Sequence, residues 1–128
     1  MGASTANSVQ AMHPPEWTAA LESFDKDLAR RAVAAKTRKA YAIDSGQFAE
    51  WASGRGLQPS SLGVRELRRY LAHLAQTGRA ASTIARKLAV IRAFLRVQME
   101  IGARSENPAE LLSSPKRPQR LPRVVWAS

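Results

Sequence analysis

The chain has 128 residues, of which 45% are hydrophobic, and it carries a formal net charge of +10. This apolar content is enough for one domain with a modest core, and it argues against a wholly disordered chain. Because the sequence has no cysteine, disulfides, thiolate zinc sites and a cysteine nucleophile are excluded, which fits a reducing cytoplasm. No apolar run approaches the roughly 20 residues of a membrane span, and the first residues lack the pattern of a signal peptide.

The positive charge is distributed unevenly. Residues 1–35 carry three basic and four acidic side chains, whereas residues 36–128 carry seventeen basic and six acidic ones. A domain with this excess attracts polyanions, because each phosphate that it neutralises releases condensed counterions. The charge therefore predicts an anionic partner such as nucleic acid. A soluble protein with an arginine-rich surface is the alternative that composition leaves open.

Two helices are expected after a flexible tail over residues 1–15. The first covers residues 16–35, because apolar residues recur there at helical spacing: Trp17, Leu21, Phe24 and Leu28. The second begins with Thr37 as its cap and ends at Gly54-Arg55-Gly56. Its inward side should hold Tyr41, Phe48, Trp51 and Ala52. These aromatic residues are expected in the core.

A third helix is expected over residues 64–76, with Gly78 as its stop, and a fourth between a Ser82 cap and a Gly102 stop. The inward stripe of the fourth helix should be Ile84, Leu88, Ile91, Leu95 and Met99. Its opposite face carries small residues and one long cation, namely Ser82, Ala85, Arg86, Ala89 and Ala93. Such a face suits a helix that must enter a groove about 12 Å wide.

A short last helix should start at an Asn107 cap, with Pro108 in its first turn, and end near Leu112. The proline- and cation-rich residues 114–128 then predict an extended basic linker. A linker with no domain after it suggests that a further domain has been left out. The helical domain itself is expected over residues 16–113.

The sequence thus predicts an all-α bundle of four to five helices that binds DNA and has no catalytic machinery, cofactor or metal site. Two segments are candidates for DNA contact: Thr37-Arg38-Lys39, and Arg79 through Lys87. Both combine hydroxyls and cations at the beginning of a helix, where the helix dipole favours a phosphate. Simple capping by Thr37 and Ser82 is compatible with this role, and a solvated charge is the alternative for Arg86.

Three stretches of the sequence form a recognisable pattern. The first is Thr37-x-x-x-Tyr41-x-x-Asp44-x-x-x-Phe48-x-x-Trp51. The second runs from Ala81-Ser82-Thr83-Ile84 through Leu88 to Ile91-Arg92-Ala93-Phe94-Leu95. The third is Asn107-Pro108-Ala109, followed by Pro115-Lys116-Arg117 and Leu121-Pro122-Arg123. In order and spacing, which are more specific than any one stretch, the pattern resembles tyrosine recombinases of the Xer and phage-integrase type over about residues 17–125.

The resemblance implies the SAM-like core-binding domain of such a recombinase, whose second and fourth helices cross the major groove. By position, Thr37, Lys39, Ser82 and Thr83 would then hold phosphates, and Arg86 would reach base edges. Lys116 and Arg117 would follow the DNA backbone along the linker. Ala42 departs from the basic residue common at its position, which weakens the second-helix contact. The family's catalytic residues would lie in the missing domain, so neither Tyr41 nor Tyr70 is expected to be a nucleophile.

The expected partners are double-stranded DNA and neighbouring recombinase protomers on it, with no membrane and no small-molecule substrate. Two other functions stay open at this stage. One is a stand-alone helix-turn-helix or nucleoid-type DNA-binding protein, although the connection over residues 77–81 is longer than the usual turn of that motif. The other is a protein-interaction module whose basic face meets an acidic partner.

Overall fold

The computed structural model describes residues 13–112, so the predictions for the tail and for the linker residues Lys116 and Arg117 lie outside the described residues. Four α-helices make up the bundle: α2 (Pro15–Arg30), α3 (Ala35–Gly54), α4 (Val64–Gln76) and α5 (Ala81–Glu100). Two short 3-10 helices, Pro59–Ser61 and Pro108–Leu111, complete it. Residues 13–112 contain no strand, which confirms the all-α prediction. None of the helices described has an apolar stretch long enough to cross a membrane.

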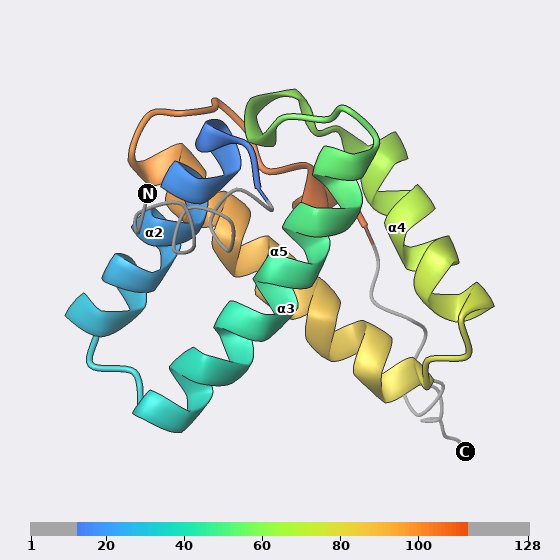
Figure 1. Ribbon diagram of the computed structural model, residues 1–128, viewed down its shortest axis with the longest axis horizontal. Helices are drawn as coiled ribbons and strands as arrows, with labels where there is room; N and C mark the ends of the chain where they lie inside the picture. The colour runs from blue at the N-terminus through green and yellow to red at the C-terminus, as the bar shows by residue number, and fades with distance from the viewer. Residues whose placement is uncertain (1–12, 113–128) are drawn as a thin grey trace, which may run out of the picture.

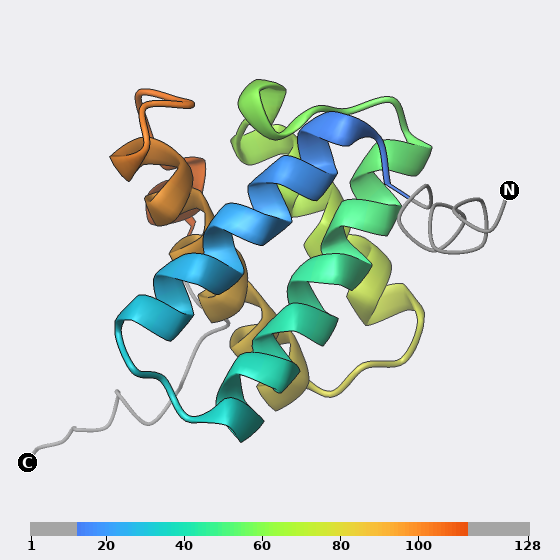
Figure 2. The same ribbon diagram turned by 60° about the vertical axis from the view of Figure 1, so that its left-hand side comes forward.

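Helix α5 is the centre of the bundle, because it packs against each of the other three α-helices. Helices α2 and α3 run side by side along it, and α4 covers its other flank (Figures 1 and 2). Helices α3 and α5 cross, and both begin at the lower edge of the bundle in both views; in Figure 1 the α3 beginning lies at the left of this edge and the α5 beginning at the right. This edge becomes important for the functional site.

The core is aromatic at its centre. Trp17, Phe24, Phe48 and Phe94 are at most 1% exposed, and Trp17 lies within 6 Å of both phenylalanine rings that flank it, with centroid distances of 5.7 Å to Phe48 and 5.9 Å to Phe94. The Trp17 indole Nε1 donates a hydrogen bond of 2.8 Å to the Leu57 carbonyl. The prediction that the aromatic residues of the second helix form the core is confirmed for Phe48, whereas Tyr41 and Trp51 pack against the core from partly buried positions.

The inward stripe of α5 is confirmed only in part. Leu88, Ile91 and Leu95 are buried, and Ile84 packs against the core from a partly buried position. The prediction for Met99 is wrong, because its side chain is 38% exposed. Methionine 99 lies in the last turn of α5, next to the exposed Glu100 and Ile101.

Helix α2 ends five residues before the predicted boundary at residue 35. The backbone turns at Ala32, whose φ is 60°. The amides of Ala32 and Val33 donate to the Ala29 and Leu28 carbonyls at 2.9 and 3.0 Å, which is the Schellman arrangement of a helix C-terminus. Because glycine usually occupies this left-handed position, an alanine gave no sequence signal for the stop. The stops at Gly56, Gly78 and Gly102, all with positive φ, lie where the sequence predicted them.

Two of the three predicted helix caps are wrong. Helix α3 begins after Ala34 and α5 after Ala80, and neither cap position has a side-chain hydrogen bond. Thr37 and Ser82 therefore lie inside the first turns, because the alanine-rich residues before them extend each helix. The Asn107 cap is confirmed, since its Oδ1 accepts from the Ala109 amide at 3.0 Å. The segment that it caps is a 3-10 turn, Pro108–Leu111, and not an α-helix.

Candidate nucleic-acid interface

The beginnings of α3 and α5 share three properties. Neither helix has an acidic residue in its first turn, and no side chain caps either of them. In each, the first residues are exposed to solvent. The first amides of a helix have no partner within the helix and lie at the positive end of its dipole. Both segments thus leave anion-binding backbone groups accessible. We call them the α3 start (residues 35–39) and the α5 start (residues 79–86).

The α3 start presents three of its polar side chains outward. Lys36, Thr37 and Lys39 are exposed. Arg38 instead turns toward α2, where its Nη2 and Nε lie 2.8 and 3.3 Å from the carboxylate oxygens of Asp25. The prediction grouped Arg38 with the DNA contacts, whereas the structure assigns its guanidinium to a contact between helices. Lys36, which the sequence analysis did not select, lies beside Thr37 on the exposed segment.

The α5 start is exposed and built mainly from small residues. Arg79 and Ser82 are exposed, and Thr83 is half-buried. Further along the same helix, Ala89 is exposed as well. The predicted face of small residues is confirmed only in part: Ser82 and Ala89 are exposed, whereas Ala85 and Ala93 are partly buried and Ala93 packs against the core. Arg86 is the long side chain on this face and is 57% exposed.

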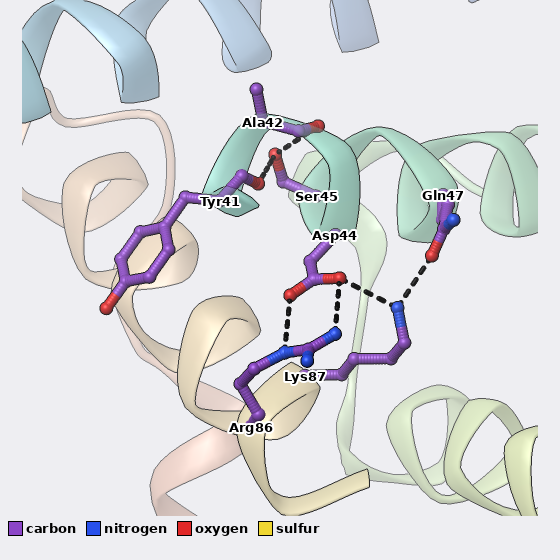
Figure 3. A network of polar contacts seen from close by, with 7 residues as sticks. All are labelled: Tyr41, Ala42, Asp44, Ser45, Gln47, Arg86 and Lys87. Atoms are coloured by element: carbon purple, nitrogen blue, oxygen red, sulfur yellow. Dashed lines mark hydrogen bonds and ion pairs between the residues drawn. The ribbon is translucent and has the colours of Figure 1, made fainter. Parts of the chain in front are cut away.

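Helices α3 and α5 meet at a buried carboxylate. Asp44, which is 4% exposed, accepts hydrogen bonds from Arg86 Nε at 3.1 Å and from Arg86 Nη2 at 3.2 Å (Figure 3). It also accepts one from Lys87 Nζ at 2.8 Å, and the same ammonium donates to Gln47 Oε1 at 2.6 Å. One carboxylate on α3 therefore holds two cations of α5, and the α5 start is fixed against α3.

Lys87 is buried, so the prediction that it contacts DNA needs correction. Its side chain is only 4% exposed and its ammonium points into the bundle. A helix turns by about 100° per residue, so Lys87 faces α3 whereas Arg86 lies at the surface. The ion pair with Lys87 stabilises the buried Asp44 carboxylate, because an unpaired carboxylate at this depth would be strongly unfavourable.

Sequence reasoning gave Asp44 no role at the site, although it stands in the pattern that carries the family resemblance. One signal was available. Asp44 lies three residues after Tyr41 and four before Phe48, so helical geometry places a carboxylate on the inward side of α3. Carboxylates are rarely buried without a charged partner. That partner comes from a helix about 40 residues away, which spacing alone does not identify.

The charges around the α5 start are almost all positive. Between Glu66 and Glu100 the chain has seven arginine and lysine residues and no acidic residue. Tyr70 is influenced by charges of both signs. Its burial first, and then the Asp44 carboxylate, raise the pKa of its phenol to about 12, whereas Arg79 lowers this pKa. At 2% exposure Tyr70 belongs to the core.

The fold and this edge define a small helical bundle with two basic, uncapped helix beginnings that are exposed to solvent. The chain belongs to the family described as phage integrase, N-terminal SAM-like domain, whose model matches residues 21–102. This confirms the family resemblance and the predicted SAM-like fold. No solved structure matches the chain significantly.

Named relatives of this chain are tyrosine recombinases. It is 31% identical over 110 residues to tyrosine recombinase XerD of Chlorobaculum tepidum, an alignment that covers 85% of this chain and 36% of the relative. It is 42% identical over 95 residues to tyrosine recombinase XerC of Pelobacter propionicus, covering 72% and 31%. With XerD of Rhizobium meliloti the identity is 33% over 97 residues, covering 76% and 31%. The chain thus spans about a third of the length of the curated relatives that it matches.

Proposed function

We propose that this chain binds duplex DNA in a sequence-specific manner at a recombination site, as the N-terminal domain of a tyrosine recombinase. Double-stranded DNA and neighbouring protomers on the same site would be its partners. The relatives support a role in DNA recombination, since those named above are tyrosine recombinases. The observation that supports the DNA contact is the crossing of α3 and α5, which are joined at Asp44 and both begin at the lower edge of the bundle (Figure 1).

The shape of α5 and the cations at the two helix starts also support DNA contact by this surface. An α-helix with its side chains is about 10–12 Å across, close to the width of the major groove. The small exposed residues Ser82 and Ala89 reduce the width of α5 on its outer face. The amides at both starts, together with Lys36, Lys39 and Arg79, would meet phosphates. In this proposal Thr37, Ser82 and Thr83 add hydroxyl contacts to the backbone, and Arg86 reaches the bases.

A pair of charge-matched variants tests the location. Lys36→Ala/Lys39→Ala removes two exposed cations from the α3 start, and Arg65→Ala/Arg68→Ala removes two from the exposed side of α4. Binding to a duplex would be measured by fluorescence anisotropy over a range of salt concentrations. Each lost phosphate contact should flatten the slope of log K against log salt by about 0.9. We expect this flattening of the slope for the Lys36→Ala/Lys39→Ala variant on every duplex, and no comparable flattening for the Arg65→Ala/Arg68→Ala variant.

Two outcomes would contradict the proposal. A larger loss in the Arg65→Ala/Arg68→Ala variant would place the interface on α4. Absence of duplex binding by the unmodified chain at moderate salt would remove the DNA function altogether, and the basic edge would then belong to an acidic protein partner.

A further inference from the structure

We infer that Asp44 is a positioning residue for base recognition, which holds Arg86 so that its outer edge can pair with a guanine. The inference rests on the proposed function and adds to it the residue that sets specificity and the base that it selects. Its starting point is the juxtaposition of an almost fully buried carboxylate and an arginine side chain that is 57% exposed, at the crossing of α3 and α5 (Figure 3).

The hydrogen bonds leave one edge of the guanidinium available. Arg86 uses Nε and Nη2 to donate to the two oxygens of Asp44. Of the five N–H groups of an arginine, this arrangement leaves both on Nη1 and one on Nη2. Those on the Nη1–Nη2 edge form a second parallel pair, directed away from the carboxylate. Guanine presents the acceptors O6 and N7 side by side in the major groove, and a bidentate arginine is their commonest specific partner.

Lys87 helps the Asp44 carboxylate to hold Arg86 in place. Its side chain is 4% exposed, and its ammonium donates to Asp44 Oδ1 and to Gln47 Oε1. The carboxylate is therefore neutralised and immobilised before any ligand arrives. Arg86 is oriented in advance and loses less rotamer freedom on binding than a solvated arginine would. Arg86 and Lys87 share the single negative charge of Asp44, so the three groups together keep a positive charge that attracts DNA.

A selection experiment tests the inference. The 128-residue chain would select duplexes from a randomised library, and dissociation constants would then be measured for the preferred duplex and for each single base-pair change. We expect one position at which guanine is favoured by about 5- to 150-fold, which corresponds to about 1–3 kcal/mol. Replacement of this guanine by 7-deazaguanine, which lacks the N7 acceptor, should remove much of the preference.

Four variants separate positioning from a purely structural role. Arg86→Ala and Asp44→Asn should both abolish the guanine preference, and their combination should cause no further loss. Lys87→Met is the graded comparison: it leaves the two Asp44–Arg86 bonds in place and removes only the support of the carboxylate by the ammonium, so it should weaken the preference less than Asp44→Asn does. Asp44→Asn/Lys87→Met removes the carboxylate without leaving Lys87 buried and unpaired, so it keeps the test valid if Asp44→Asn alone does not fold.

The outcomes distinguish the inference from the proposed function. A folded Asp44→Asn/Lys87→Met variant with the full guanine preference would overturn the positioning role while DNA binding stands. A selected sequence with no guanine that depends on Arg86 would also overturn it. Failure of the unmodified chain to bind any duplex would overturn the proposed function and, with it, this inference.

Discussion

Replacement of Asp44 by alanine should destabilise the bundle severely. The Lys87 side chain is 4% exposed in the unmodified chain, and removal of the Asp44 carboxylate would leave its ammonium with Gln47 Oε1 as the remaining partner among the contacts seen for it. Breaking a buried ion pair by removing one partner costs about 3–5 kcal/mol. A domain of this size has a total stability of about 5–15 kcal/mol, so this one substitution would remove a large part of it.

The Asp25–Arg38 pair provides a matched control. Its nitrogen–oxygen distance is also 2.8 Å, but its side chains are 49% and 34% exposed. Exposed ion pairs contribute about 0–1 kcal/mol, so Asp25→Ala should have little effect. The measurement is urea unfolding followed by circular dichroism, with both variants compared with the unmodified chain under the same conditions.

A rescue variant completes this test. Adding Lys87→Met to Asp44→Ala removes the unpaired ammonium and should restore much of the lost stability, because apolar replacements of buried ion pairs are often neutral or stabilising. Equal, mild losses in Asp44→Ala and Asp25→Ala would refute the argument that Asp44 anchors the crossing. So would a double variant that is less stable than Asp44→Ala alone.

Three further predictions concern the rest of the bundle. Phe94→Ala should lower stability by about 3–5 kcal/mol in the same unfolding assay, since Phe94 is fully buried against Trp17 and Phe24; a loss below 1 kcal/mol would contradict the aromatic core. Ala32→Gly should raise stability by about 0.5–1 kcal/mol, because it relieves the left-handed strain at φ 60°, and a loss of stability would contradict this. The Tyr70 pKa of about 12 in the folded chain exceeds its usual value of about 10, so the contribution of this phenol to the free energy of unfolding is intact below pH 10. It should then fall by up to about 2 kcal/mol as the pH rises to 12, and Tyr70→Phe should lack this fall.

The sequence predicted those features of the fold that depend on local patterns. The periodic apolar residues of α5 identified most of its buried face, and the glycines after α3, α4 and α5 marked the ends of these helices. The end of α2 was missed because Ala32 occupies a position that glycine normally takes. The caps Thr37 and Ser82 were wrong because helix propensity extended α3 and α5 by a few residues beyond the polar side chains.

The candidate site was predicted at the level of segments but not of individual contacts. Both segments, around Thr37 and around Ser82, are at the surface as expected. The partners of Arg38, Arg86 and Lys87 were not predicted, because each lies on another helix and a charge pattern does not show which carboxylate a cation meets. The orientation of Lys87 in particular depends on the tertiary position of Asp44.

The central claim is that the α3 start and the α5 start together form the surface that binds DNA. The most direct test is an NMR titration of the labelled chain with a short duplex, in which backbone amide shifts are followed residue by residue. The account predicts that the largest shifts fall in residues 35–39 and 79–86. Shifts confined to the outer side of α4 around residues 65–69, or to the exposed side of α2, would contradict it.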